Sequence, residues 1–467
     1  MSHQMAAHPS VQQEQVLARK LSAGQQAMIA VGGSIGTGLF LASGAAVPTA
    51  GPAVILSNLV IAGISLLLGS ALTEMCVAHP AAGSFGLYAE MYVSPFAGYA
   101  VRMSYWISQL VAVGGHMIAT SIYMRYWFPE VPGVVWIVGF SGLLLYINAR
   151  AVSTFGSFEY WFSMIKVVAV AVFVVLGVMA MSGLTGTGTG AGLANYTAHG
   201  GFLPKGLSGV LLAACFAYYS FIGVEMTAIA SGEAAQPEKT IPRAFRRQVF
   251  ALSSVYVVTT AILVGVIPWN QMGTAESPFV SVLRQSGIPG TAAVMNFVVL
   301  TAALSSANAC LYLVARTLFS LSKGGLVPEA LGALSSRGVP VNALWVAAVG
   351  LALAVLVQTR LGESAYVWFL GVALFGALFC WVMIFVTHIA FRRAWARSGT
   401  PAPAYQAPFG EAGSAIGAVA MLGVLYGTWW ISGLDVSVKA AVPWLGMVGL
   451  LYLLTARRGS RTSAHKE

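Results

Sequence analysis

Charged residues are scarce in this chain of 467 residues: they make up 8% of it, whereas hydrophobic residues make up 58%. An ordinary soluble domain has roughly a quarter of its residues charged. With so few charged side chains, the chain cannot build a surface that faces water on all sides. The composition therefore excludes a soluble globular protein and favours one embedded in a lipid bilayer.

Cysteine is equally scarce, and its placement excludes two further classes of protein. The four cysteines, Cys76, Cys215, Cys310 and Cys380, lie in or at the edge of apolar stretches and never in CxxC spacing. We therefore predict neither a disulfide framework nor a metal site. The zinc-protease pattern HExxH is also absent, and we expect neither an enzyme nor a cofactor.

Long apolar runs are what the chain has in abundance. A helix needs about 20 apolar residues to cross about 30 Å of hydrocarbon, and the runs lack the short alternation of outer-membrane strands. We therefore predict an all-α polytopic membrane protein with twelve transmembrane helices. Their expected cores are 26–46, 52–76, 97–124, 131–149, 157–182, 206–231, 248–268, 289–322, 340–358, 364–391, 413–432 and 438–456.

The net charge of +10 could point to nucleic acid, but the distribution of basic residues argues for membrane topology instead. With the N-terminus inside, eighteen of the 24 Lys and Arg fall on the cytoplasmic side and five outside, leaving Lys166 within a span. This is the positive-inside rule. We therefore expect an inner-membrane protein with both termini cytoplasmic, in contact with the lipid bilayer and with no nucleic-acid partner.

The spans leave no room for a soluble domain. We expect a transmembrane domain over 19–458, cytoplasmic tails at 1–18 and 459–467, and an external loop around 183–205. Residues 1–25 are polar and mixed, so we expect the first span rather than a cleavable signal peptide to direct insertion.

Two predicted spans, the first and the sixth, are interrupted by glycine and small polar residues. The first contains Gly32 to Gly38 in the order GGSIGTG, and the sixth contains SFIGVE at 220–225 followed by SGE at 231–233. Small residues can serve helix packing alone, but corresponding breaks in two halves point to a transport site. An offset of five spans predicts inverted repeats, at about 24–183 and 204–393, with two further helices at about 413–456.

Four stretches carry a resemblance to a known family. They are GGSIGTGLFLASG at 32–44, GPAVILSNLVIAG at 51–63, SFIGVEMTAIASGEAAQPEKTIPRA at 220–244 and LSSANACLYLVARTLFSLSKGGLVPE at 304–329. With these the chain resembles the amino acid/polyamine/organocation superfamily, and within it the bacterial permeases for aromatic, basic, aliphatic and γ-amino acids. The resemblance implies the leucine-transporter-like fold of five plus five inverted repeats, with helices 1 and 6 broken, and alternating access.

The two breaks offer sites for both charges of an amino acid. Free N–H groups at a helix start bind anions, so we expect Gly36, Thr37 and Gly38 to receive the carboxylate, with Ile35 as a further substrate-binding residue of the same stretch. The resemblance assigns the ammonium to backbone at Ser34, Tyr219 and Ile222. It also implies that Tyr219 and Phe216 close over the substrate, although ordinary aromatic packing is an alternative for both.

Two ionisable residues inside spans are candidates for a functional role, because such residues are costly in a bilayer. Glu225 could brace the unwound segment or carry a proton. The resemblance places Lys166 where sodium-coupled relatives hold an ion, against Ser305 and Ser306 of span eight. A lysine there could alternate between charged and neutral forms, so we predict a proton as coupling ion and independence of sodium, with snorkelling to the interface as the alternative.

Three further residues are candidates for selectivity and gating. His116 stands where many relatives have a glutamate, and it could bind a substrate side chain, titrate, or be a core histidine. Glu233 and Arg316 lie where the family has charged positions of an inner gate. Solvated topology charges are an equally good account of the nearby Lys239 and Arg243.

These features predict secondary active transport, namely proton-coupled import of neutral or aromatic L-amino acids. Only Glu225 would offer a counter-charge to a cationic substrate, which makes a permease for basic or γ-amino acids a less favoured alternative. An exchanger on the same fold is the nearest competing interpretation, followed by a channel or a transporter-like receptor.

Overall fold

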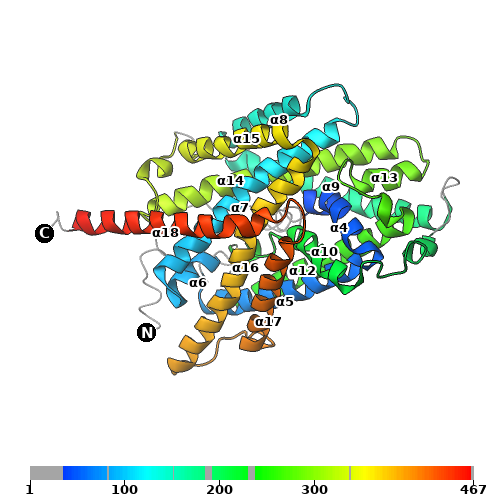
Figure 1. The fold of residues 1–467 in the computed structure, drawn as a ribbon. Coiled ribbons are helices and arrows are strands. Elements are labelled where there is room, and N and C mark those ends of the chain that lie inside the picture. Colours follow the sequence, from blue (N-terminus) through cyan, green and yellow to red (C-terminus); the bar gives the residue numbers. More distant parts are fainter. Residues whose placement is uncertain are drawn as a thin grey trace.

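The computed structural model describes residues 35–80, 84–150, 152–184, 192–229, 237–335 and 338–463, and every regular element in them is a helix (Figure 1). The longer elements are α5 (Val54–Ala78), α7 (Pro95–Met124), α8 (Gly133–Asn148), α9 (Val152–Met181), α10 (Gly206–Phe221), α12 (Pro237–Val266), α14 (Thr291–Lys323), α15 (Val341–Leu361), α16 (Ala365–Arg397), α17 (Gly410–Thr428) and α18 (Val436–Ser463). The shorter helices include η2 (Gly38–Ala42), α4 (Ser43–Ala50), α6 (Ser84–Tyr92), α11 (Met226–Ile229) and α13 (Pro278–Gln285).

The helices confirm the predicted fold class. Each predicted core from 52–76 onward coincides with one of them, and within the described residues nine spans are long and apolar enough to cross a bilayer. Two shorter apolar helices, α8 and α10, cover two more of the predicted cores. The first span begins outside the described residues, so the count of twelve stays a prediction.

Local sequence explains where several helices begin and end. The α7 helix starts at Pro95, which needs no N–H partner, after Ser94, whose hydroxyl oxygen accepts a hydrogen bond from the Ala97 N–H at 3.1 Å. The α12 helix begins at Pro237, well before the predicted core at 248, because its first turns are amphipathic and carry basic residues. The α18 helix continues into the segment expected to be a tail and ends at Ser463.

Two groups of helices organise the molecule. Elements η2, α4, α5, α10 and α12 pack together and are called the bundle here; α7, α8, α14 and α15 form a second group, the scaffold (Figure 1). Helices five spans apart lie against each other: α5 with α12, α7 with α14, and α8 with α15. This pairing agrees with the predicted five plus five repeats, whose bounds stay a prediction. The α16 helix touches both groups, packing on α7 and on α5.

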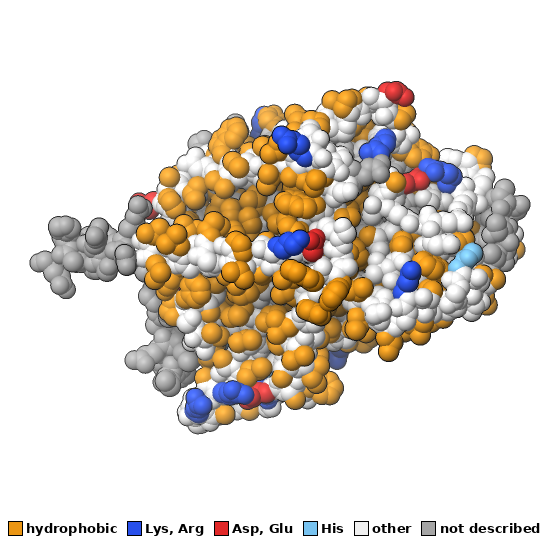
Figure 2. All heavy atoms as spheres, in the orientation of Figure 1, with side chains coloured by type: hydrophobic (Ala, Val, Ile, Leu, Met, Phe, Trp, Pro, Cys, Tyr) orange, Lys and Arg blue, Asp and Glu red, His pale blue; other side chains and the backbone are white. Residues whose placement is uncertain are grey.

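On the face shown in Figure 2, apolar side chains cover wide areas, and the charged side chains are few and scattered. Large hydrophobic side chains are exposed along whole helices, for example Val135, Val138 and Tyr146 on α8. A water-soluble monomer rarely exposes contiguous apolar area of this extent. In a bilayer the same surface contacts lipid, and the polar residues are left for the interior.

Candidate functional site

The described part of the first span is not a regular helix. Ile35 and Gly36 lie in a bend, and the chain then forms the π-helix η2 before the α-helical α4 begins at Ser43. The N–H groups of Leu39 and Phe40 both point to the carbonyl of Gly36, each at 3.2 Å. Single turns of π-helix are common at functional sites, so the irregular backbone lies where the glycine motif predicted a break.

Gly36 and Gly38 allow two other helices to approach this break closely. A Cβ atom on Gly36 would lie 2.5 Å from the Ser306 hydroxyl oxygen on α14, and one on Gly38 would lie 2.9 Å from the Ser220 Cα on α10. Neither distance leaves room for a side chain. Helix packing, the simpler interpretation of the motif, thus accounts for these two glycines in addition to the break.

The break in the sixth span separates α10 from α11. The α10 helix ends at Phe221 because Ile222 has extended ψ, at 133°, and Gly223 has φ of +106°, a conformation that favours glycine. Helical structure resumes at Met226. The two broken spans meet at their breaks, since Gly38 lies against Ser220, one residue before the end of α10.

Glu225 is fully buried and lies inside this second break. Its carboxylate oxygens accept hydrogen bonds from the Gly223 N–H, at 3.0 and 3.1 Å, and from the Trp381 indole N–H on α16, at 3.1 Å. A buried carboxylate requires such donors, because it cannot be solvated by water. Glu225 therefore stabilises the left-handed turn at Gly223 and joins the break to α16.

The α12 helix satisfies carbonyl groups that the break leaves without helical partners. The Tyr256 hydroxyl donates to the Ser220 carbonyl at 2.5 Å, and the Gln248 side-chain amide reaches the Gly223 carbonyl at 3.5 Å. These two carbonyls therefore already accept hydrogen bonds. The carbonyls that were predicted to bind the substrate ammonium are those of the neighbouring residues Tyr219 and Ile222.

Thr37 is held between α7 and α16. Its hydroxyl lies 2.9 Å from Nδ1 of His116, and its carbonyl accepts a hydrogen bond from the Tyr366 hydroxyl at 3.2 Å. The other ring nitrogen of His116, Nε2, lies 3.9 Å from the Cys310 thiol on α14. The residue that replaces the family's glutamate thus contacts both the first break and the scaffold, and its role in selectivity stays a prediction.

Lys166 lies on α9 and is completely buried. Its ammonium donates a hydrogen bond to the Ser305 hydroxyl on α14 at 2.9 Å. The adjacent Ser306 hydroxyl faces Gly36 and, among the described residues, has no hydrogen-bond partner. The structure therefore brings together the lysine, the hydroxyls of span eight and the first break; the coupling role of Lys166 stays a prediction.

The two candidate aromatic residues of α10 have different neighbours. Tyr219 is buried beside Thr37, with Tyr123 and Tyr366 near it. Phe216 instead lines a small cavity between α10 and the elements η2, α4, α5 and α12. That cavity has a volume of about 20 Å³, which suits a water molecule but not an amino acid. Tyr219 therefore lies beside Thr37, whereas Phe216 shares its cavity with Gly38.

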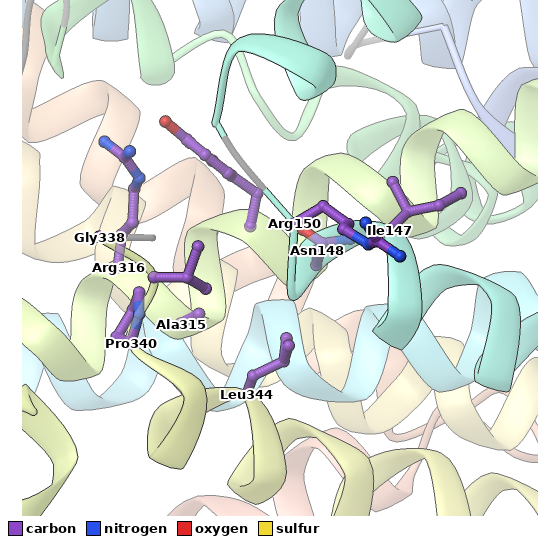
Figure 3. A pocket seen from close by; sticks show the side chains of 10 residues that line it. Ile147, Asn148, Arg150, Ala315, Arg316, Gly338, Pro340 and Leu344 are labelled. Atoms are coloured by element: carbon purple, nitrogen blue, oxygen red, sulfur yellow. The ribbon is translucent and has the colours of Figure 1, made fainter. Parts of the chain in front are cut away.

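The remaining predicted residues lie elsewhere. Ser34 and Glu233 fall outside the described residues. Arg316 stacks on the ring of Tyr312 at 4.2 Å. It also lines a cavity beside α14, between the end of α8 and the start of α15, together with Arg150 and Asn148 (Figure 3). Within the described part of the chain, no three His, Cys, Asp or Glu side chains are grouped so that they could hold a metal ion.

Comparison with known proteins decides the family. The model of the amino acid permease family matches residues 25–462. The chain belongs to the amino acid permease family. The aromatic amino acid transport protein AroP of Escherichia coli K12 is 35% identical over 440 residues, which cover 94% of this chain and 95% of that protein. The corresponding protein of Shigella flexneri gives the same identity and coverage.

A second kind of relative is the uncharacterized amino acid permease YtnA of Bacillus subtilis 168, which is 34% identical over 383 residues, covering 82% of this chain and 83% of that protein. Family membership makes this permease a membrane transport protein with amino acids as its small-molecule substrates. The two broken helices and the side chains that surround them are therefore the place to look for the substrate.

Proposed function

We propose that this permease imports aromatic and other neutral L-amino acids across the inner membrane by proton symport, with both termini in the cytoplasm. The single observation that carries the coupling is the buried hydrogen bond from Lys166 to Ser305, beside the first break. Lysine can exchange its proton in a protein interior, which arginine does not do. One proton bound per cycle at Lys166 would act in place of a bound metal cation.

The charges around the breaks support a neutral substrate. Glu225 is the carboxylate nearest to them in the described residues, and its oxygens already bind the Gly223 N–H and the Trp381 indole. A cationic side chain would have to share this carboxylate with these donors. The names of the AroP relatives add support for aromatic substrates, as does the tyrosine-rich surrounding of Thr37.

Uptake into proteoliposomes tests this proposal. Labelled phenylalanine, tyrosine, tryptophan, leucine, lysine and γ-aminobutyrate are offered under an inward proton gradient, with and without sodium and an uncoupler. We expect accumulation of aromatic substrates that the uncoupler abolishes and that sodium leaves unchanged. Uptake only into vesicles preloaded with another amino acid would mean an exchanger and would refute symport.

Lys166 is tested separately. Lys166→Ala is expected to abolish proton-driven accumulation while substrate counterflow continues, because counterflow needs no return of the empty carrier. Lys166→Arg, which keeps the charge but cannot release it, is expected to behave like alanine. Accumulation at the wild-type level in either variant would refute the coupling role. The inner-gate role of Glu233 and Arg316 remains a prediction that these measurements do not address.

A further inference from the structure

The two breaks and the side chains around them are called the substrate region here. A second buried polar cluster lies away from it, where α5 ends. Glu74 is the centre of this cluster, with its side chain 2% exposed. Its carboxylate accepts hydrogen bonds from Nε2 of His388 on α16, at 3.1 Å, and from the Ala407 N–H, at 2.7 Å. Nε of Arg392 lies 3.4 Å from the other carboxylate oxygen. Removing a partner from a buried charge of this kind is costly.

His388 connects the cluster to a third helix. The imidazole is fully buried, and its Nδ1 lies 2.7 Å from the Ser414 hydroxyl on α17. Because an ionised carboxylate can only accept, Nε2 is the donor toward Glu74, and the Ser414 hydroxyl can rotate to suit either state of Nδ1. Hydrogen bonds therefore join α5, α16 and α17 at this end of the molecule.

The α16 helix also contacts both breaks, and it does so with the same face. Tyr366, Trp381 and His388 lie within about 60° of one another around the helix, at 100° per residue. Tyr366 donates to the Thr37 carbonyl of the first break, and Trp381 donates to the Glu225 carboxylate of the second break. His388 donates to the Glu74 carboxylate of α5. One face of α16 is thus fixed to three elements of the bundle, two of them at the substrate region.

The contact of α16 with the scaffold is of a different kind. A Cβ atom on Gly376 would lie only 2.2 Å from the Ser104 carbonyl of α7, so the two backbones touch. The Ser108 hydroxyl on α7 donates to the Ala373 carbonyl of α16 at 2.7 Å. Backbone contact cannot be released by rotating a side chain, whereas each bond to the bundle can break singly.

We infer that Glu74 and His388 form a latch that holds α16 to the bundle in the conformation described, and that it opens when the carrier changes the side to which its site is exposed. The inference rests on the proposed function only in requiring alternating access, not in the substrate or the coupling ion. A helix fixed to two groups that move apart must release one of them. The bundle side is held by side-chain hydrogen bonds, whereas the scaffold side has close backbone contact in addition to its hydrogen bond. Glu74 and His388 are therefore positioning residues for transport.

Cys310 provides a native reporter for this step. It is the partly exposed member of the four cysteines, the other three being buried, and it lies beside His116. The rate at which N-ethylmaleimide labels Cys310 therefore measures how often the substrate region opens. The assay needs neither substrate nor a proton gradient, so its failure is distinguishable from failure of the proposed symport. Cys310→Ser gives the background.

Opening the latch should raise the labelling rate. A hydrogen bond to a charged group changes an equilibrium by about tenfold or more, so Glu74→Ala and His388→Ala are each expected to speed labelling about tenfold. The effect of the double variant is expected to be clearly smaller than the product of the two single effects, because both substitutions remove the same contact between Glu74 and His388. Glu74→Gln keeps an acceptor oxygen and should restore much of the wild-type rate.

A matched control joins α16 to α17, the two helices that the His388–Ser414 contact also joins. Arg393 and Glu411 form an ion pair at 3.0 Å between α16 and α17, with side chains 63% and 41% exposed. Surface pairs contribute little, so Arg393→Ala should leave labelling unchanged. If the alanine variants at the latch fail to fold, Ser414→Ala removes only a hydroxyl and is expected to speed labelling about fivefold.

Two outcomes would overturn the inference. In the first, folded Glu74→Ala and His388→Ala proteins, monodisperse on size exclusion, label at the wild-type rate, and so does Ser414→Ala. In the second, the effects of the two alanine substitutions multiply in the double variant, which would show that the residues act independently.

Discussion

Replacing Gly38 by alanine places a methyl group between the two breaks. The added Cβ would lie 2.9 Å from the Ser220 Cα, 3.1 Å from its hydroxyl oxygen and 3.3 Å from its backbone nitrogen. Carbon atoms pack at about 3.5–4.0 Å, so the first span and α10 must separate by several tenths of an ångström. The obstacle is backbone, and no rotamer change removes it.

Overpacking of this kind costs about 1–3 kcal/mol. Thermal unfolding in detergent and initial uptake rates at a series of substrate concentrations measure the effect. We expect Gly38→Ala to lower Tm and to raise KM at least fivefold, because about 1 kcal/mol corresponds to a factor of five. The substrate region is distorted where both broken helices meet, so transport should suffer more than expression.

Gly63→Ala provides the control. Gly63 lies on α5 with no atom within 4 Å of its added Cβ, and the change only improves helix propensity, by up to about 1 kcal/mol. Uptake by this variant should match wild type. If Gly38→Ala behaved like Gly63→Ala in both assays, the close contact between the breaks would not exist in the membrane.

Three further predictions follow from contacts around the breaks and at the end of α5. Gly36→Ala should impair uptake because its Cβ would lie 2.5 Å from the Ser306 hydroxyl, and adding Ser306→Ala should restore part of it by removing that atom; no recovery would argue against this contact. Trp381→Phe removes a donor from the buried Glu225 carboxylate, at a cost of about 1.5–3 kcal/mol. It should raise KM about tenfold or more, and an unchanged KM would mean that this bond from α16 does not contribute to substrate binding. Burial lowers the pKa of His79 from 6.5. The unfolded state therefore binds the proton more readily than the folded state, and stability falls as pH drops below about 6.5. Between pH 7 and pH 5 the Tm of His79→Gln should fall less than the Tm of wild type.

Hydrophobic length and glycine placement made the fold and the two breaks predictable. Runs of about 20 apolar residues must be helical in lipid, and a positive φ such as that of Gly223 needs glycine. The short helices α6 and α13 were not predicted, because eight or nine residues of mixed polarity are not distinguishable from a loop. The start of α12 was missed since amphipathic turns outside the membrane core do not raise hydropathy.

The partners of the site residues were harder to predict. Trp381 and Tyr366 are aromatic residues in an apolar span, and the sequence does not distinguish those that face lipid from those that face a break 156 or 329 residues away. Glu74 and His388 did carry a signal. Each is an ionisable residue within an apolar stretch, which is costly unless it is paired, and a search for such residues would have found both.

The hydrogen bonds of this permease divide by how far they reach along the chain. The bond from the Gly223 N–H to Glu225 spans two residues and moves with the sixth span, whatever the surrounding helices do. The bond between Thr37 and His116 joins the bundle to the scaffold, and it must stretch or break if the two groups move apart. Substitutions that remove local bonds should therefore affect stability in every conformation, whereas those that remove bonds between the groups should change the balance between conformations and hence the rate of transport.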